Sequence, residues 1–391
     1  PLASVLLLLN TFVCLIPMDA QTAFGGMYVT SSAVDVMKAI LSMGTFIVIL
    51  QSRVWAAKSG KEGEFYMLIV STLLGMFAMM SAGNFLMFFL GLEMASVPLA
   101  CAVAFDMYRK NSAEAAAKFI LTATFSSGVM LYGISFLYGE FGTLYFADIT
   151  AKMQATPLTI MGLVFFFSGL GFKISLVPFH FWTADTYQGA PTTVTGYLSV
   201  ISKGAAAFTL LSILFHVFGG IMEYWHVLLM IVVVLSITIA NLFAVRQSEL
   251  KRFMAFSSIS QAGYIMLTAI GNDWVSSVSA LSYYVLIYVV ANMAVFTIIS
   301  VVEQNNNGKT NIDDYNGFYQ TNPRLSFLMT LAMFSLGGIP PFAGMFSKFF
   351  VFMSGVNGAN INTTMGAWAY GVVFIALLNT VISLYYYLKI V

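Results

Sequence analysis

Long apolar runs, separated by short polar stretches, follow one another along this chain. Twelve runs are bounded by polar residues or by Gly, Asn or Pro, and most approach the length of about 20 residues that an α-helix needs to cross a bilayer. The pattern predicts an all-α protein, a polytopic bundle of about twelve transmembrane helices. The predicted helices span residues 1–16, 31–51, 65–81, 85–105, 113–138, 157–180, 191–217, 227–245, 253–270, 275–302, 325–355 and 366–388.

Two of these runs contain a break in their interior. In the run 157–180, Pro178 follows Lys173, and in the run 325–355 two glycines and two prolines precede Lys348. Because proline removes a backbone donor and clashes with the preceding turn, we expect both helices to unwind where polar neighbours can satisfy the freed carbonyl groups. Interrupted helices at matching places in two halves of a chain indicate a transport site.

The breaks also suggest how the chain is organised. Residues 1–64 hold N-terminal transmembrane helices, residues 65–217 hold five more, and residues 227–388 hold another five. The interrupted helix is the fourth in each set of five. Because five is odd, the second set begins on the opposite side of the membrane, so the count predicts two inverted repeats.

Basic residues of the loops lie almost entirely on one side of the predicted membrane. Alternate loops hold eleven Lys or Arg residues in one set and only Lys152 in the other. The excess of positive charge places the first set in the cytoplasm. Its members are Arg53, Lys58, Lys61, Arg109, Lys110, Arg246, Lys251, Arg252, Lys309, Arg324 and Lys389.

Composition excludes several classes of protein. Hydrophobic residues make up 59% of the chain and charged residues 8%, which is too few charges to cover a soluble globule. The net charge of +1 and the lack of a basic run argue against a nucleic-acid partner. The two cysteines, Cys14 and Cys101, lie far apart within apolar runs, so neither a disulfide framework nor a metal site is predicted.

Five lysines lie inside the apolar runs, where a charge costs about 2.5 to 3.5 kcal/mol on insertion scales. Lysine in apolar surroundings can change its charge near neutral pH, whereas arginine keeps its proton, and no arginine lies inside a run. The pattern therefore predicts proton transfer within the membrane. The five are Lys38, Lys118, Lys173, Lys203 and Lys348.

Two of these lysines have an alternative structural interpretation. Lys38 follows Asp35 by three residues at a helix end, and an interfacial ion pair is the preferred interpretation, outside the mechanism. Lys118 follows Glu114 by one turn, so a surface ion pair competes with a role in proton transfer.

Glu93, Lys203 and His180 complete the candidate path. Glu93 is the only carboxylate deep within a run, and Lys203 stands twelve residues into its run, roughly 18 Å deep and too far from either surface to reach water fully. His180 closes the first interrupted run and could pass protons between Lys173 and Lys203. A structural histidine with satisfied hydrogen bonds fits its position equally well.

Several strings of the sequence resemble subunit N of bacterial respiratory complex I, the counterpart of mitochondrial NADH dehydrogenase subunit 2 in an antiporter-like family. The resemblance covers nearly the whole chain, and the string that ends in Tyr-Gln-Gly-Ala-Pro-Thr is specific. Family members have more helices than this chain, so one or two are expected to be missing here. The strings are residues 90–93, 118–121, 171–192, 246–252 and 257–264.

The resemblance implies a proton-translocating membrane-arm subunit of NADH:quinone oxidoreductase, an enzyme of respiratory electron transport in the bacterial inner membrane. Glu93 and Lys118 match an acid–base pair that modulates the lysine at Lys173, and Lys348 favours subunits N and L over subunit M. The Tyr-Gln-Gly-Ala-Pro string then favours N. The proton path implied is Glu93, Lys118, Lys173, His180, Lys203 and Lys348.

The same resemblance implies that this chain holds no redox centre, cofactor or metal. NADH, FMN, iron–sulfur clusters and quinone would bind to other subunits. The partners implied are an adjacent antiporter-like subunit, a small membrane subunit and bilayer lipid. Two alternatives remain: a subunit of a multisubunit cation/proton antiporter or membrane-bound hydrogenase, and a structural spacer whose charges are paired and inert.

Overall fold

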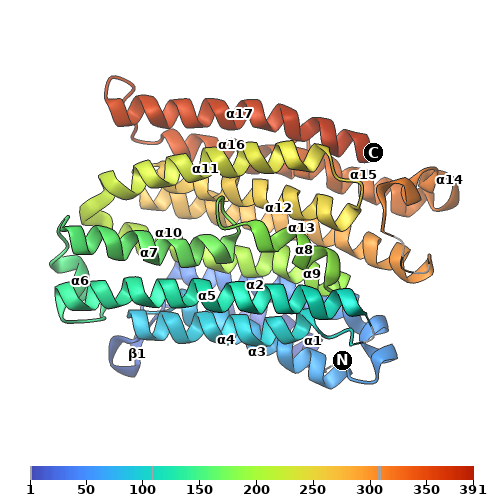
Figure 1. The fold of residues 1–391 in the computed structure, drawn as a ribbon, viewed down its shortest axis with the longest axis horizontal. Helices are drawn as coiled ribbons and strands as arrows, with labels where there is room; N and C mark the ends of the chain where they lie inside the picture. Colours follow the sequence, from blue (N-terminus) through green and yellow to red (C-terminus); the bar gives the residue numbers. More distant parts are fainter. Residues whose placement is uncertain (1, 108, 307, 309) are drawn as a thin grey trace.

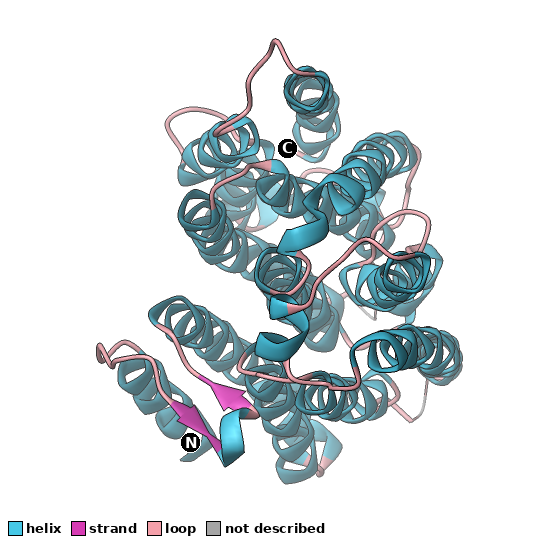
Figure 2. Ribbon diagram, turned by 90° about the vertical axis from the view of Figure 1, so that its left-hand side faces the viewer, coloured by secondary structure: helices cyan, strands magenta, loops and turns pink. Residues whose placement is uncertain are grey.

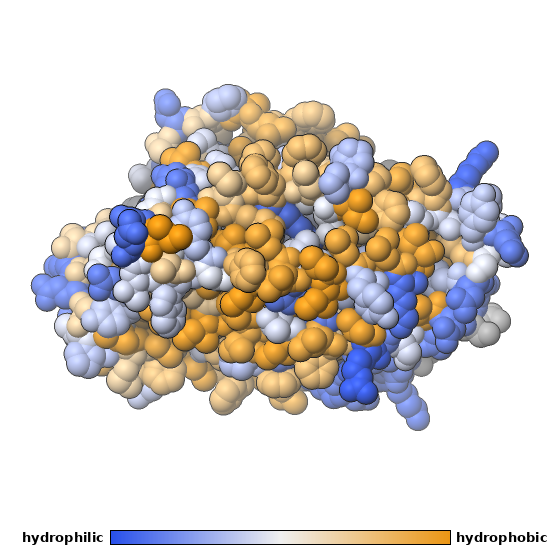
Figure 3. Space-filling view, turned by 90° about the horizontal axis from the view of Figure 1, so that it is seen from above, coloured by the Kyte–Doolittle hydropathy of each residue, from blue (hydrophilic) through white to orange (hydrophobic). Residues whose placement is uncertain are grey.

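The computed structural model describes residues 2–107, 109–306, 308 and 310–391. Its helices run side by side along the long axis of the molecule (Figure 1), and a view along that axis shows most of them end-on (Figure 2). Apolar side chains cover the middle of the surface in Figure 3, and polar ones gather towards its two ends, as expected for a protein that crosses a bilayer. Pro1 and Lys309, which fall in a predicted run and a predicted cytoplasmic loop, lie outside the described residues.

The first half of the chain forms helices that match the predicted runs, with a short hairpin and a short helix between them. The hairpin pairs β1 (Thr22–Ala23) with β2 (Tyr28–Val29) around the 3-10 turn η1 (Phe24–Gly26). The helices are α1 (Leu2–Cys14), α2 (Ser32–Ser59), α3 (Glu62–Met80), α4 (Phe85–Val103), α5 (Lys110–Phe141), α6 (Phe146–Ala151), α7 (Pro157–Ile174), α8 (Phe181–Gly189), α9 (Thr192–Tyr197) and α10 (Lys203–His216), with the π-helical turn η2 (Leu198–Ser202) before α10.

The second half continues in the same way. Its helices are α11 (Met222–Val245), α12 (Leu250–Leu267), α13 (Trp274–Asn305), α14 (Phe318–Thr321), α15 (Pro323–Gly337), α16 (Ala343–Val356) and α17 (Thr364–Ile390), with 3-10 turns η3 (Gly219–Ile221), η4 (Thr268–Ile270) and η5 (Ile312–Tyr315). Figure 1 places α6, which precedes Lys152, at one end of the bundle and α14 with the C-terminus at the other. The loop with the single basic residue therefore lies opposite loops of the basic set.

Each of the twelve predicted runs corresponds to helical structure. Within the described residues, ten helical segments are long and apolar enough to cross a membrane. The other two runs differ for physical reasons: α1 has only 13 residues, and the run 325–355 is divided by its break into α15 and α16. The prediction of a polytopic helical membrane protein is confirmed.

Both predicted breaks are present. After α7, Ser175 has a left-handed backbone with φ of 68°, and Leu176 N–H donates to the Gly171 carbonyl at 2.8 Å. The Trp182 indole then donates to the carbonyl of Phe172 at 3.0 Å, so side-chain and backbone donors satisfy the carbonyl groups that the break exposes. After α15, Gly338 has φ of 82°, a conformation that favours glycine.

A third irregularity was not predicted. The run 191–217 contains no proline, yet it passes through the π-helical turn η2 directly before Lys203. Such turns inside α-helices often occur at functional sites because they change the direction in which neighbouring side chains point. Here the turn separates α9 from α10 in the centre of the bundle, where every residue of η2 is buried.

Candidate proton-transfer site

Lys203 lies at the centre of the bundle and is 1% exposed. Its ammonium nitrogen, Nζ, donates to Ser258 Oγ of α12 at 2.7 Å and lies 5.3 Å from the centre of the Tyr187 ring. The Tyr187 hydroxyl is in turn 3.4 Å from Ser258 Oγ. Among the described residues no carboxylate forms an ion pair with Lys203. The prediction that Lys203 is deeply buried is confirmed.

Lys173 is buried at the end of α7, one residue before the helix stops. Its Nζ donates to Ser96 Oγ of α4 at 2.8 Å. Glu93 lies one turn earlier on the same helix as Ser96 and, together with Lys173, lines a small cavity between α4, α5 and α7. The first interrupted helix therefore presents its lysine to the half-buried carboxylate that the sequence singled out.

Lys118 forms no ion pair with Glu93 in this structure, so its role in the path stays a prediction. Its Nζ lies 2.8 Å from Glu114 and 2.7 Å from Asp185, and its side chain is 45% exposed. The reason is the direction of its face of α5, which points towards α8. The surface pair with Glu114, which the sequence left open as an alternative, is confirmed.

Asp185 in α8 joins three helices because it also accepts from Arg252 Nη1 of α12 at 2.6 Å. The hydrogen bond from Lys118, together with that from Arg252, holds the pKa of the Asp185 carboxyl below its ordinary value. A lowered pKa means that the stabilisation is fully present at neutral pH and is lost only when the pH falls through the folded-state pKa. Asp185 therefore fixes the second part of the interrupted helix to α5 and α12.

Replacing Asp185 with Asn is expected to lower the thermal stability of the protein at pH 7 only slightly, by about 1 kcal/mol or less, because partly exposed ion pairs contribute little. Thermal melting of the purified protein measures the change. Glu64→Gln, at an exposed carboxylate of α3, is the control. A loss of several kcal/mol would contradict the expectation that this partly exposed group of ion pairs contributes little to stability.

His180 is 7% exposed and precedes α8 in the first break. Its Nδ1 atom has no hydrogen-bond partner among the described residues, and neither Lys173 nor Lys203 lies within hydrogen-bond distance of it. His180 could therefore pass a proton between Lys173 and Lys203 only if water molecules bridged the gap on each side of the imidazole. Its role in the path stays a prediction.

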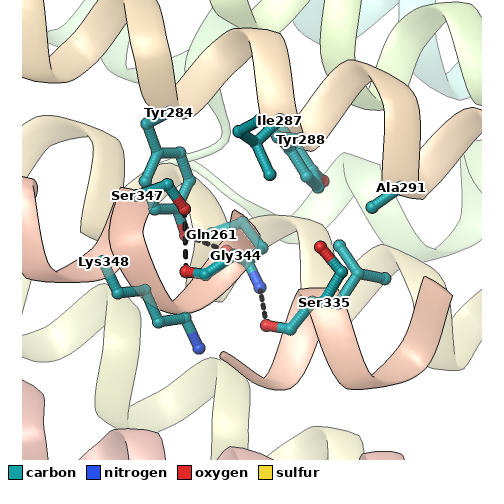
Figure 4. A pocket seen from close by; sticks show the side chains of 10 residues that line it. Gln261, Tyr284, Ile287, Tyr288, Ala291, Ser335, Gly344, Ser347 and Lys348 are labelled. Atoms are coloured by element: carbon teal, nitrogen blue, oxygen red, sulfur yellow. Dashed lines mark hydrogen bonds between the residues drawn. The ribbon is translucent and has the colours of Figure 1, made fainter. Parts of the chain in front are cut away.

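Lys348 is buried in α16 beside the second break. Its Nζ donates to the carbonyl of Gly337 at 2.9 Å, the group freed where α15 ends, and lies 5.1 Å from the centre of the Tyr264 ring. Figure 4 shows the pocket that Lys348 lines together with Gln261 and Tyr284. As with Lys173 and Lys203, none of the ion pairs found in the described ranges includes it.

Sequence reasoning missed most of the polar groups that lie between Lys203 and Lys348. They stand on α12, where Ser258 contacts Lys203 and Gln261 lines the pocket of Lys348 one turn later. The Gln261 amide accepts from the Tyr284 hydroxyl and donates to the Tyr387 hydroxyl at 3.0 Å. The sequence held one signal, the Ser and Gln side chains in the middle of the apolar run 253–270, and the structure shows that the helix carrying them is buried on all sides.

Lys38 forms the expected pair outside this path. Its Nζ lies 3.4 Å from Asp35 and 3.1 Å from the Tyr28 hydroxyl of the hairpin.

Cys14 and Cys101 are free thiols. In the part of the chain that the structure describes, no group of three or more His, Cys, Asp or Glu side chains could hold a metal ion.

The chain is similar to known proteins over its whole length. It is 59% identical to NADH-quinone oxidoreductase subunit N of Phocaeicola vulgatus, covering 100% of this chain and 81% of that protein. Its identity to the subunit of the same name from Azobacteroides pseudotrichonymphae is 53%, covering 94% of this chain and 75% of the relative.

Solved structures share the fold. A chain of respiratory complex I from Thermus thermophilus with bound aureothin aligns with a TM-score of 0.82 at 31% identity, covering 99% of this chain and 82% of that chain. A chain of the Mrp complex from Dietzia aligns with a TM-score of 0.82 at 20% identity, covering 100% of this chain and 73% of that chain, and shows a likeness of fold alone. The family model described as NADH:quinone oxidoreductase/Mrp antiporter, transmembrane, matches residues 82–375. This chain belongs to that family of multi-pass membrane proteins.

Proposed function

We propose that this chain is a proton-translocating membrane-arm subunit of a respiratory NADH:quinone oxidoreductase in a bacterial inner membrane. The observation that carries the proposal is the set of three buried amines, Lys173, Lys203 and Lys348, which contact hydroxyl groups, a carbonyl or an aromatic ring. A permanent charge without a counter-ion is costly in apolar surroundings. Amines in such places are therefore suited to gain and lose a proton.

The polar groups between these amines support a path along the middle of the bundle. Ser258 and Gln261 on α12 extend from Lys203 towards Lys348, and hydroxyl groups of this kind can exchange protons when water joins them. On the other side of Lys203, Lys173 and Glu93 share a cavity at the first break. Protons would move along this axis, with His180 between Lys173 and Lys203.

The energy for transport would come from other subunits. Moving one charge through a membrane potential of 100 mV costs about 2.3 kcal/mol. We propose that this chain holds no redox centre, so this free energy would have to be supplied by reactions on other subunits. NADH, FMN, iron–sulfur clusters and quinone would be bound elsewhere, and coupling would pass through an adjacent antiporter-like subunit and a small membrane subunit. The inverted repeats 65–217 and 227–388 would each supply one interrupted helix whose two parts can shift against each other.

The name of the relatives and the alignment with a complex I chain at 31% identity support this assignment over a separate antiporter. Purification in a mild detergent tests it. The chain should co-purify with an NADH-oxidising, quinone-reducing assembly, and vesicles that contain this assembly should accumulate protons when NADH is added. Recovery with sodium/proton antiporter subunits, and without NADH oxidation, would contradict the proposal.

A further inference from the structure

A largely buried carboxylate lies at the predicted cytoplasmic end of the bundle, away from the lysine axis. Glu303, near the end of α13, has a side chain that is 11% exposed. It accepts a hydrogen bond from Arg109 Nη1 at 2.8 Å and another from the hydroxyl of Thr192, the first residue of α9. The buried Lys251 of α12 donates to the carbonyl of Ala190, two residues before Thr192. Because Thr192 begins α9, its hydrogen bond places Glu303 at the start of the helical segment that leads to Lys203.

A small cavity adjoins this carboxylate. Its lining combines apolar side chains with polar ones, among them Glu303, Arg109, Asp106 and the hydroxyl-bearing residues Thr192 and Thr193. Thr193 is 3% exposed, and its hydroxyl has no hydrogen-bond partner among residues 2–107, 109–306, 308 and 310–391. Buried hydroxyl groups beside such a cavity are normally satisfied by water, so this cavity is suited to hold water between Glu303 and Thr193.

Hydroxyl groups continue from the cavity towards Lys203 at helical spacing. Thr192, Thr195 and Ser199 follow one another at intervals of three and four residues, which places them on one face of α9 and η2. Asn292 of α13 donates to Ser199 Oγ, and its own carbonyl oxygen has no partner within the described ranges. The end of this row meets Lys203, because Ser258 donates to the Ser199 carbonyl at 3.3 Å and accepts from Lys203.

We propose that Glu303 is the group that collects protons from the cytoplasm and delivers them to Lys203. A hydronium ion would give its proton to a Glu303 carboxylate oxygen and leave as water. The carboxylic acid would pass that proton to water at Thr193 and return to carboxylate. The proton would then move along water and the hydroxyl row until the Lys203 amine becomes ammonium. This inference rests on the function proposed above.

Glu303→Gln tests the proposal because it keeps the size and the acceptor for Thr192 but has no acidic proton. In vesicles that contain the complete complex, we expect NADH-driven proton pumping to fall by at least about tenfold, as for other positioned acid–base groups. Glu303→Asp should restore most of it. Glu64→Gln, an exposed carboxylate of α3, is the matched control and should pump as the unaltered complex does.

The pH profile separates proton collection from a structural role. Residual pumping by Glu303→Gln should fall more steeply as the pH rises from 6.5 to 8.5, because uptake then depends directly on free hydronium. The titratable groups that face Glu303 are Arg109, Asp106, Lys251 and Tyr315. They are present in both the Glu303→Gln variant and the unaltered protein, so they do not account for a difference between the two pH profiles. An equal loss at every pH would overturn the proposal in favour of a structural ion pair, and unchanged pumping would overturn it outright.

Thr193→Val provides a test if Glu303→Gln does not assemble. This change removes a hydroxyl group that bonds to no described residue, so assembly should be kept while pumping falls several-fold. Unchanged pumping in Thr193→Val would then overturn the proposal. Lys203→Met is run in parallel: loss of pumping there with no effect at Glu303 or Thr193 rejects only this uptake route, whereas normal pumping in all three variants rejects the proposed function.

Discussion

Lys203→Met is expected to reduce NADH-driven proton pumping by about a hundredfold or more while the complex still assembles. Methionine has a similar length and is apolar, so it fits the buried site better than a charge does. It removes the amine that contacts Ser258, at the point where the hydroxyl row of α9 meets the polar side chains of α12. A proton on either side would then have no acceptor at the centre of the bundle.

The measurement compares proton accumulation in reconstituted vesicles with the amount of assembled complex in the same membranes. Lys58→Met, at an exposed position near the end of α2, is the matched control and should pump normally. Normal pumping by Lys203→Met would remove this residue from the path. A loss of assembly in proportion to the loss of pumping would indicate a structural role instead.

Gly344→Ala is expected to impair both stability and pumping, because the added methyl group has no room. A Cβ atom at Gly344 would lie 1.7 Å from the Ser335 carbonyl oxygen of α15, so α16 would have to move away. Forcing extra atoms into a packed contact costs about 1 to 3 kcal/mol. Lys348 stands one turn further along α16 and donates to the Gly337 carbonyl, so the same movement would draw its amine out of the pocket.

We therefore expect Gly344→Ala to lower both the melting temperature of the complex and its pumping, the latter by about tenfold if the hydrogen bond of Lys348 is lost. Gly371→Ala in α17 is the control, since a Cβ atom there meets nothing within 4 Å and alanine favours a helix over glycine. If Gly344→Ala pumped normally, tight packing at the second break would not be what positions Lys348.

The amino-acid sequence alone determined the features that depend on local chemistry. Apolar runs specified helices because a bilayer leaves backbone groups no other partners, and the sequences around Pro178 and Gly338 specified the two breaks because they interrupt a helix whatever surrounds it. The cost of a membrane charge was enough to single out Lys173, Lys203 and Lys348. All three are buried within the bundle.

Only the tertiary structure decided which side chains meet. Lys118 pairs with Glu114 one turn earlier on α5, as the spacing in the sequence allows, but its second partner, Asp185 of α8, is set by the packing of the two helices. Gln261 and Glu303 were missed for the same reason, since ordinary polar residues become part of a path only when helices distant in sequence pack against them. The type of each residue determines the chemistry that its side chain can perform. Which side chains come into contact depends instead on the distances between helices, and these are set by the packing of the whole bundle.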